Sequence, residues 1–296
     1  MALPFDPTEL ARYGGLSLVA RTVVEGFLTG IHRSPFKGFS IEFAEHRQYY
    51  PGDEIRHIDW RAFGKTDRYY IKEYEEETNL KCFLVVDASG SMKYRGQQKL
   101  SKFEYAQQVA ASLAYLMLAQ LDGVGLILHD TKVKNLVPAK TNSKHLLTIL
   151  RALEATKPEG ETALAPIWHE IAGHYLKRRG LVIILSDGFD QADAIGRALQ
   201  HLRFRNHEVI FFHNLAPEEL DFPFKQPTKF RNLEDRAHEI TTDARRLREE
   251  YLANFNTWRA DIRRRAEDLH IDYLMLKTSD PIDRALGAYL ARRTLR

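Results

Sequence analysis

The sequence contains a single cysteine, Cys82, among its 296 residues, so the chain cannot form an internal disulfide. Cys82 lies within the apolar run KCFLVVD, and we expect it to be a reduced residue of the core. A run of about 18 apolar residues is also missing, which argues against a membrane-spanning helix. The first residues, MALPFDPTEL, lack the basic start and apolar centre of a signal peptide. We therefore expect a cytoplasmic protein.

An excess of charge of one sign is missing as well. The 43 lysines and arginines nearly balance the 40 aspartates and glutamates, which leaves a formal net charge of +3. Such a balance does not favour binding to nucleic acid or to an anionic membrane. Hydrophobic residues make up 44% of the sequence, which is ordinary for a soluble globular protein with a sizeable core.

The composition changes near residue 80, which divides the sequence into two expected domains. Residues 1–80 are rich in aromatic residues, glycine and charge, and include two strand-like segments joined by a turn at Pro51-Gly52. They predict a small mixed or β-rich N-terminal module. In residues 81–296, short apolar runs alternate with helical patterns, which predicts an α/β domain with a doubly wound, mainly parallel sheet.

Two of the apolar strands are followed by an aspartate, Asp87 after FLVV and Asp187 after VIILS. In an open parallel sheet the carboxyl ends of the strands lie at one edge, and ligands bind there near the switch point of strand order. Ser89 and Ser91 follow Asp87, and Thr162 lies in an intervening loop. All of these side chains are hard oxygen donors, which suit Mg²⁺. We expect them to form a solvent-facing rim that contributes little to the core.

A purely structural explanation is open for each of these residues. Ser89 and Ser91 are of the type that caps helices or closes turns, and Asp187 is of the type that ends a strand before a turn at Gly188. Their joint placement after two buried strands and in one intervening loop favours a shared site over separate local roles.

The segments DASGSM, GETAL and LSDG resemble the three loops of the metal-ion-dependent adhesion site of von Willebrand factor A domains. The matching positions are Asp87, Ser89 and Ser91 in the first loop, Thr162 in the second and Asp187 in the third. The resemblance implies that these residues hold Mg²⁺, with Mn²⁺ as an alternative, directly or through water. It also implies that an acidic residue of a partner protein completes the coordination. Glu161 stands where that family often has glycine, and its charge makes it a candidate partner-binding residue.

The segment FAEHRQYYPGDEIRHIDWRAFGKTDRYYIKEYEEE is similar to the signature of the bacterial domain-of-unknown-function family 58. This resemblance covers nearly the whole chain. It implies an A-like domain that works with a MoxR-type AAA+ ATPase in the maturation or remodelling of other proteins. Arg56, Trp60 and Arg61 lie in this segment and are of the types that anchor partners, but they equally suit a clamp that holds the module to the sheet. We favour the clamp.

Motifs of several enzyme classes are missing. The sequence has no G-x-x-x-x-G-K-[ST] loop and no G-x-S-x-G turn. A phosphohydrolase of the haloacid dehalogenase type needs a second carboxylate two residues after its aspartate, where this chain has Ser89. The segment HEIAGH spaces His169 and His174 five residues apart, whereas a zinc-binding helix needs a spacing of four. We expect a noncatalytic protein, with a metal-dependent phosphohydrolase as the alternative.

Nucleic-acid binding is the second alternative, because the helical segment 243–270 is rich in arginine. Its seven arginines against six acidic residues leave a net charge of only +1. This pattern favours a solvated helix with pairs of opposite charge four residues apart, in which Arg263, Arg264 and Arg265 could still dock an acidic partner.

Overall fold

The computed structural model describes residues 15–30, 46–48, 60, 63–64, 69–72, 81–234, 238–283 and 286–287. The chain divides into two compact units, of which one comprises Met1–Arg33 with Leu80–Arg296 and the other Ser34–Asn79. The smaller unit contains the short antiparallel strands β1 (His46–Gln48) and β2 (Tyr70–Lys72). In the same unit the ring of Phe63 stacks on Tyr69 at a centroid distance of 4.5 Å.

Helix α2 (Gly15–Gly30) belongs to the larger unit, although the sequence placed it in a module of residues 1–80. It packs against helix α4 (Lys102–Ala119). Ala20 and Val24 are buried on this face, with exposed fractions of 0% and 1%. The smaller unit is therefore shorter than the expected module, because the apolar face of α2 is buried in the larger unit.

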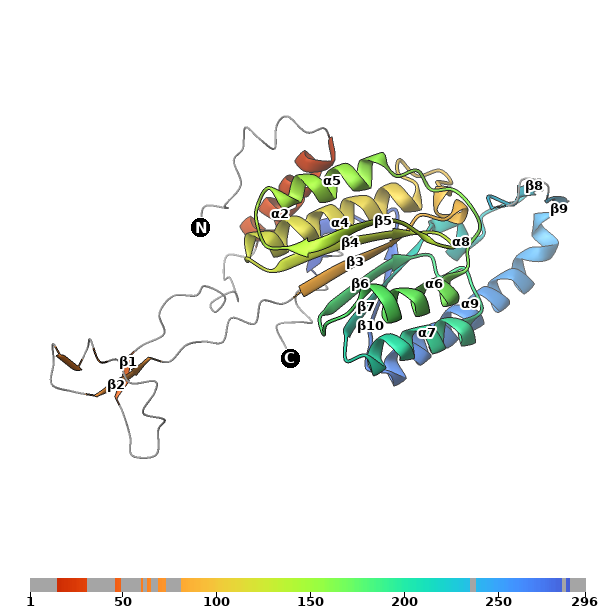
Figure 1. Cartoon of the computed structure of the whole chain (residues 1–296). Helices are drawn as coiled ribbons and strands as arrows, with labels where there is room; N and C mark the ends of the chain where they lie inside the picture. Colours follow the sequence, from red (N-terminus) through yellow and green to blue (C-terminus); the bar gives the residue numbers. More distant parts are fainter. Residues whose placement is uncertain are drawn as a thin grey trace. The chain divides into compact units, whose positions relative to one another are not determined.

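The larger unit is built around a six-stranded sheet with the order β10-β7-β6-β3-β4-β5 (Figure 1). Its strands are β3 (Lys81–Asp87), β4 (Gly123–His129), β5 (Val133–Lys140), β6 (Leu181–Ser186), β7 (Glu208–Leu215) and β10 (Asp272–Lys277). The strands pair in parallel, except that β5 runs antiparallel to β4 at one edge. The apolar runs of β4 and β6 are buried along their whole length, as expected for strands covered on both faces.

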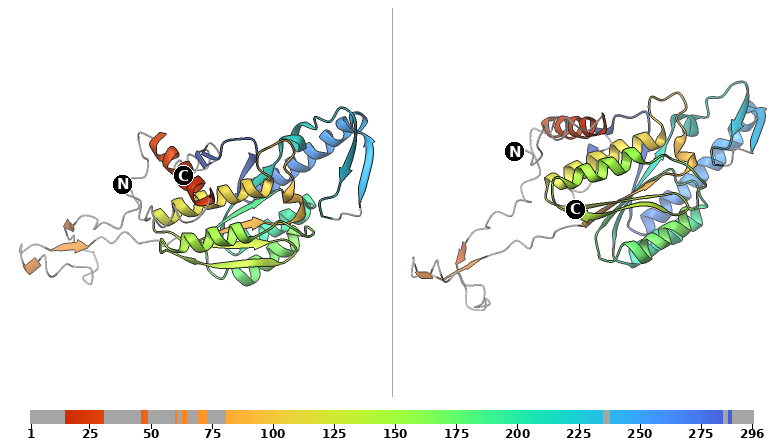
Figure 2. Two further views of the ribbon diagram at one scale, coloured as in Figure 1. Left: turned by 90° about the horizontal axis from the view of Figure 1, so that it is seen from above. Right: turned by 45° about the horizontal axis from the view of Figure 1, so that its top comes forward.

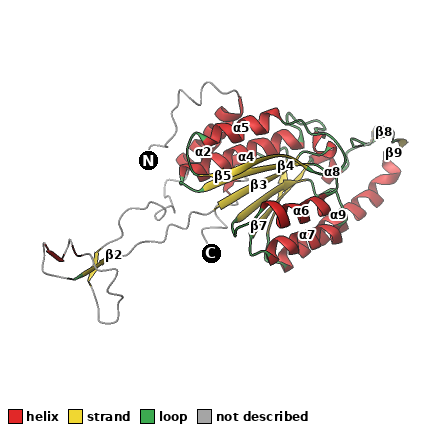
Figure 3. Cartoon of the chain, viewed as in Figure 1, coloured by secondary structure: helices red, strands yellow, loops and turns green. Residues whose placement is uncertain are grey.

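Helices cover both faces of this sheet (Figures 2 and 3). One face carries α2, α4 and α5 (His145–Ala155), and the other carries α6 (Leu164–Glu170), α7 (Ala192–Phe204) and α9 (Ala244–Asp268). The fold class predicted from the sequence, a doubly wound and mainly parallel α/β sheet, is confirmed. Among the helices that the structure describes, none combines the length and the apolar character needed to cross a membrane.

The boundaries of α4 follow from local chemistry. Ser101 caps the helix, because its hydroxyl accepts a hydrogen bond from the Glu104 amide while the Glu104 carboxylate accepts one from the Ser101 amide. The α4 side chains of Tyr105, Leu113 and Leu118 are fully buried. The cap places Lys102 in the first turn, beside the carboxyl edge of the sheet.

A β-hairpin between β7 and α9 was not predicted from the sequence. It consists of β8 (Pro227–Arg231) and β9 (Glu239–Asp243) and follows the short helix α8 (Pro217–Asp221). Phe230 of the hairpin stacks on Phe222, which in turn lies against Tyr251 of α9 at a centroid distance of 4.5 Å. These rings attach the hairpin to α9. After β10, residues 282–283 and 286–287 are helical, and residues 284–285 and 288–296 lie outside the described residues.

Candidate functional site

The strand order reverses between β3 and β6. The chain leaves β3 to form β4 and β5 on one side of it, and then crosses to form β6 on the other side. Such a switch point is where open parallel sheets bind ligands. Asp87 ends β3, and Asp187 directly follows β6, so the two aspartates lie at one edge of the sheet, as predicted. The strand order additionally places them on either side of the switch point.

The loop after β3 is organised by the carboxylate of Asp87. Asp87 Oδ1 accepts a hydrogen bond from the Ser89 amide (2.9 Å), and Oδ2 accepts one from the Ser186 hydroxyl (2.6 Å). The hydroxyl oxygens of Ser89 and Ser91 lie 3.1 Å apart. A single 3₁₀ turn, η2 (Gly90–Lys93), follows, and the Ser89 side chain makes no capping bond to it. The hydroxyl of Ser89 is thus directed to Ser91 and not to the helix end.

The expectation of a solvent-facing rim is wrong for part of the site. Asp87 and Ser89 are 0% exposed and Asp187 is 2% exposed, whereas Ser91 and Thr162 are half-buried. The loops after β3 and β6 fold over the strand ends, and this covers the residues nearest the sheet. Only the outer side of the site faces solvent.

The two aspartates have opposite electrostatic environments. Burial and the negative charge of Asp187 raise the pKa of Asp87 to about 7, against the opposing effect of its hydrogen bonds from Ser186 and Ser89. Burial also acts to raise the pKa of Asp187, but the ammonium of Lys102 and a hydrogen bond from Ser91 outweigh it and hold that pKa below its usual value. Asp187 is therefore the charged partner of the pair.

Lys102 is a site residue that the sequence did not indicate. Its Nζ lies 2.7 Å from Asp187 Oδ2 and 2.7 Å from Glu219 Oε1, and its side chain is 3% exposed. Burial acts to lower the pKa of Lys102, but the two carboxylates raise it above the usual value. In the sequence, Lys102 is 85 positions from Asp187 and 117 positions from Glu219. No local motif could therefore indicate that these side chains meet.

The second predicted loop is tied to the first. Gly90 donates a backbone hydrogen bond to the carbonyl of Gly160 (2.9 Å), and Glu159 donates one to the carbonyl of Ala88 (2.9 Å). Thr162, two residues further along, donates from its amide to Glu234 Oε2 (3.0 Å) and from its hydroxyl to Glu234 Oε1. The sequence did not indicate Glu234, which lies in the connection between β8 and β9.

The remaining candidates from the sequence do not join this cluster in the described structure. Glu161 is exposed beside Thr162. Trp60 is 59% exposed in the smaller unit, and Arg56 and Arg61 lie outside the described residues. The Nδ1 atom of His169 lies 3.0 Å from the Nδ1 atom of His201.

Three consecutive arginines of α9 pair with nearby acidic residues. Arg263 pairs with Glu267, Arg264 with Asp261, and Arg265 with Asp261 and with Asp193 of α7. This agrees with the interpretation of α9 as a solvated helix laced with ion pairs.

The donor chemistry of the cluster fits a hard divalent cation. The predicted positions supply only oxygen atoms, from Asp87, Ser89, Ser91, Thr162 and Asp187. Among the described residues, no three His, Cys, Asp or Glu side chains are grouped as a metal site, and most donors of this cluster are hydroxyls. Mg²⁺ binds through few carboxylates together with neutral oxygen ligands and water, so the set suits it.

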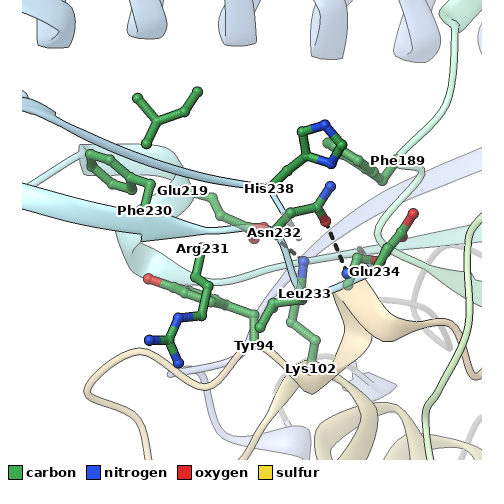
Figure 4. A pocket seen from close by; sticks show the side chains of 12 residues that line it. Tyr94, Lys102, Phe189, Glu219, Phe230, Arg231, Asn232, Leu233, Glu234 and His238 are labelled. Carbon is green, nitrogen blue, oxygen red and sulfur yellow. Dashed lines mark hydrogen bonds and ion pairs between the residues drawn. The ribbon is translucent and has the colours of Figure 1, made fainter. Parts of the chain in front are cut away.

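A cavity of about 370 Å³ lies beside the cluster, between the loop after β3 and the hairpin. Ser91 is among its lining residues, and so are Lys102 and Glu219, which Figure 4 shows side by side. The hairpin lines the outer side with Phe230 and Glu234 among others. The hairpin β8–β9 therefore covers this part of the carboxyl edge of the sheet.

The sheet order and this site define an α/β protein whose ligand edge is the switch point of a mainly parallel sheet. The chain belongs to the DUF58 family, described as proteins of unknown function, whose family model matches residues 45–261. The uncharacterized protein Rv1480 of Mycobacterium tuberculosis is 27% identical over 280 residues, which cover 92% of this chain and 86% of that protein. The uncharacterized protein YeaD of Bacillus subtilis is 29% identical over 110 residues, covering 37% of this chain and 25% of YeaD.

The chain is also similar to solved structures at low sequence identity. An aerotolerance-related membrane protein of Bacteroides fragilis has a TM-score of 0.49 at 18% identity, and the match covers 73% of this chain and 98% of that one. The VWA domain of SpRpn10 has a TM-score of 0.39 at 11% identity, covering 70% of this chain and 93% of that domain. These similarities concern the fold alone.

Proposed function

We propose that this protein is a noncatalytic adaptor that binds Mg²⁺ or Mn²⁺ at the switch point and docks an acidic residue of a partner protein through the ion. The observation that supports the proposal is the contact of Ser89, Ser91 and Asp187 beside Asp87, together with the backbone hydrogen bonds that tie the loop before Thr162 to the loop after β3. Ser89 and Ser91 come from the first loop, Thr162 from the second and Asp187 from the third.

The charges of these residues favour an outside anion as the ligand that completes the site. When bound, the ion supplies a positive centre that attracts a carboxylate. With the ion bound, Asp87 would lose its proton and contribute one negative charge, and the hydroxyls would contribute none. The charge of Asp187 is already shared with Lys102 (2.7 Å), so it offsets less of the charge of an ion. The site would therefore keep enough positive character to bind a glutamate or aspartate of a partner.

Family membership and the resemblance of the loops to an adhesion site support a protein as the partner. The resemblance points to a MoxR-type AAA+ ATPase or its client, in the maturation or remodelling of other proteins in the cytoplasm. Binding of the purified pair should be strong in Mg²⁺ and weak in EDTA. Equal affinity in both buffers would show that docking does not use the ion.

Calorimetry with Mg²⁺ tests the site itself. Asp87→Asn keeps the shape of the side chain and removes its charge, so we expect it to abolish binding. Asp193→Asn is the matched control, because Asp193 is an exposed aspartate of α7 that pairs with Arg197 and Arg265. Binding that is the same in wild type and in Asp87→Asn would overturn the proposed function.

A further inference from the structure

Building on the proposed function, we propose that Glu234 is an internal ligand of the site. The hairpin β8–β9 thereby supplies, from the same chain, the carboxylate that an acidic residue of a partner must replace. The hairpin connection is then a competitor that keeps the site closed until a suitable partner arrives.

The first argument is the close approach of the backbone. A Cβ atom placed on Gly90 would lie 2.7 Å from the carbonyl oxygen of Leu233 and 3.1 Å from the Cα of Glu234. A contact of 2.7 Å to a backbone oxygen is not tolerated, so the missing side chain of Gly90 lets Leu233 lie directly on the loop that carries Ser89 and Ser91. The carbonyl oxygen of Gly160 approaches the same position to 2.8 Å. The hairpin thus touches the center of the predicted site and not its periphery.

The second argument is the direction of the Glu234 side chain. Asn232 closes the hairpin connection by donating from its amide to the His238 carbonyl (2.9 Å). Its side-chain oxygen accepts a hydrogen bond from the Glu234 amide (2.9 Å), which fixes the backbone at that residue (Figure 4). The carboxylate of Glu234 then meets the amide and the hydroxyl of Thr162, the donor of the second loop.

The third argument is charge. Both side-chain bonds described for Glu234 come from Thr162, which is neutral, while the ammonium of Lys102 is bound to Asp187 and Glu219. Glu234 therefore adds a negative charge to an edge that already carries Asp87 and Asp187. A cation bound between these loops would be attracted by the charge of Glu234 as well as by those of the two aspartates, so the arrangement is suited to an ion.

The consequence is a threshold for partners. A carboxylate on the same chain acts at a high effective concentration, so it outcompetes single acidic residues that bind weakly. A partner has to gain additional contacts to displace Glu234. The cavity between the hairpin and Lys102 is available for such contacts.

The test uses the full-length protein and the metal alone. Amide hydrogen exchange is measured for residues 227–243 in Mg²⁺ and in EDTA, and Mn²⁺ affinity and the number of exchangeable waters on Mn²⁺ are measured by water proton relaxation. We expect Mg²⁺ to slow exchange of the hairpin in the wild type. Glu234→Gln should lose this protection, bind Mn²⁺ roughly tenfold more weakly and leave more water on the ion.

Glu239→Gln is the matched control, because Glu239 lies on the same hairpin but pairs with Lys229 and Arg231. It should behave as the wild type. Glu234→Gln that matches the wild type in hairpin protection, Mn²⁺ affinity and hydration would overturn the role of Glu234, while metal binding that depends on Asp87 would preserve the proposed function. Failure of the wild type to bind either ion would overturn both.

Discussion

Single residues decide the electrostatics of the switch point, and Lys102 is the most consequential of them. It is buried beside Asp187 and reaches the partly exposed Glu219, and it neutralises one of the two aspartates that the sequence had assigned to a metal. The hydrogen-bond donors described for the Asp87 carboxylate are neutral groups, the Ser89 amide and the Ser186 hydroxyl. The two aspartates look equivalent in the sequence and are not equivalent in the structure.

Replacing Lys102 by methionine should destabilise the protein strongly in the absence of metal. The substitution leaves Asp187 buried without its cation, and breaking a buried pair in this way costs about 3–5 kcal/mol. Mg²⁺ should restore part of the lost stability by supplying positive charge to the same edge. Urea unfolding in EDTA and in Mg²⁺ measures both effects, with the exposed Lys99→Met as the control. An equal loss in the two buffers would contradict the link between Lys102 and the ion.

His129, at the end of β4, should make the stability of the protein depend on pH. Its ring is buried, it accepts a hydrogen bond from Trp168 Nε1 (3.2 Å), and burial lowers its pKa to about 4. An unfolded histidine has a pKa of about 6.5, so the unfolded state binds more protons between these values. The free energy of unfolding should therefore fall as the pH drops from about 6.5 towards 4, by up to about 3 kcal/mol from this residue.

The difference between wild type and His129→Asn isolates this contribution. His213, whose pKa burial also lowers to about 4, and Asp87, whose pKa is raised, titrate in both proteins and cancel in the comparison. The variant should show a shallower loss of stability between pH 6.5 and 4.5 in urea titrations. Parallel profiles for the two proteins would refute a neutral, buried His129.

At the scale of elements, the hairpin β8–β9 and the loop after β3 depend on each other. Gly90 is required by close approach rather than by an unusual backbone conformation, because its φ is not in the left-handed region. Gly90, which has no side chain, therefore stands at the point where the hairpin contacts the loop after β3. The serines on either side of Gly90 are brought under the hairpin by the same contact.

Gly90→Ala should push the hairpin away from the sheet edge. The added methyl group meets the backbone carbonyl oxygens of Leu233 and of Gly160, which cannot rotate aside. We therefore expect a loss of about 1–3 kcal/mol in the free energy of unfolding and faster amide exchange in β8 and β9. Gly173→Ala is the control, because a Cβ there meets nothing within 4 Å. Unchanged exchange of the hairpin in Gly90→Ala would show that the two elements do not press on each other.

At the scale of the whole molecule, the larger unit is assembled from two stretches of the sequence. Helix α2 precedes the smaller unit in the chain, yet it packs on α4 of the larger one. The smaller unit, Ser34–Asn79, is thus an insertion between α2 and β3 in the order of the chain. The larger unit is consequently not complete from residue 81 onward.

Val24→Asp and Leu18→Asp form a matched pair that tests this assembly. Val24 is 1% exposed and Leu18 is 66% exposed on the same helix. We expect Val24→Asp to lower the free energy of unfolding of the larger unit by about 3 kcal/mol, because it buries an unpaired charge, and Leu18→Asp to change it by less than about 0.5 kcal/mol. Chemical denaturation measures both, and equal effects would place α2 outside the folded unit.

Several features followed from the sequence alone because they depend on local pattern. Continuous apolar runs predicted the buried strands β3, β4 and β6, and helical periodicity predicted α7 and α9. Since parallel strands share one carboxyl edge, the positions of Asp87 and Asp187 after their strands were enough to bring them to the same switch point.

Other features were decided only by the tertiary structure, since they rest on contacts between distant residues. Lys102 reaches Asp187 across 85 positions, and Thr162 reaches Glu234 across 72. Strand β5 and the hairpin strands are edge or exposed elements with mixed polar composition, so hydrophobic pattern did not reveal them. Charge pairing and close backbone approach leave no periodic trace in a sequence, and they determine here which carboxylates are satisfied and what covers the site.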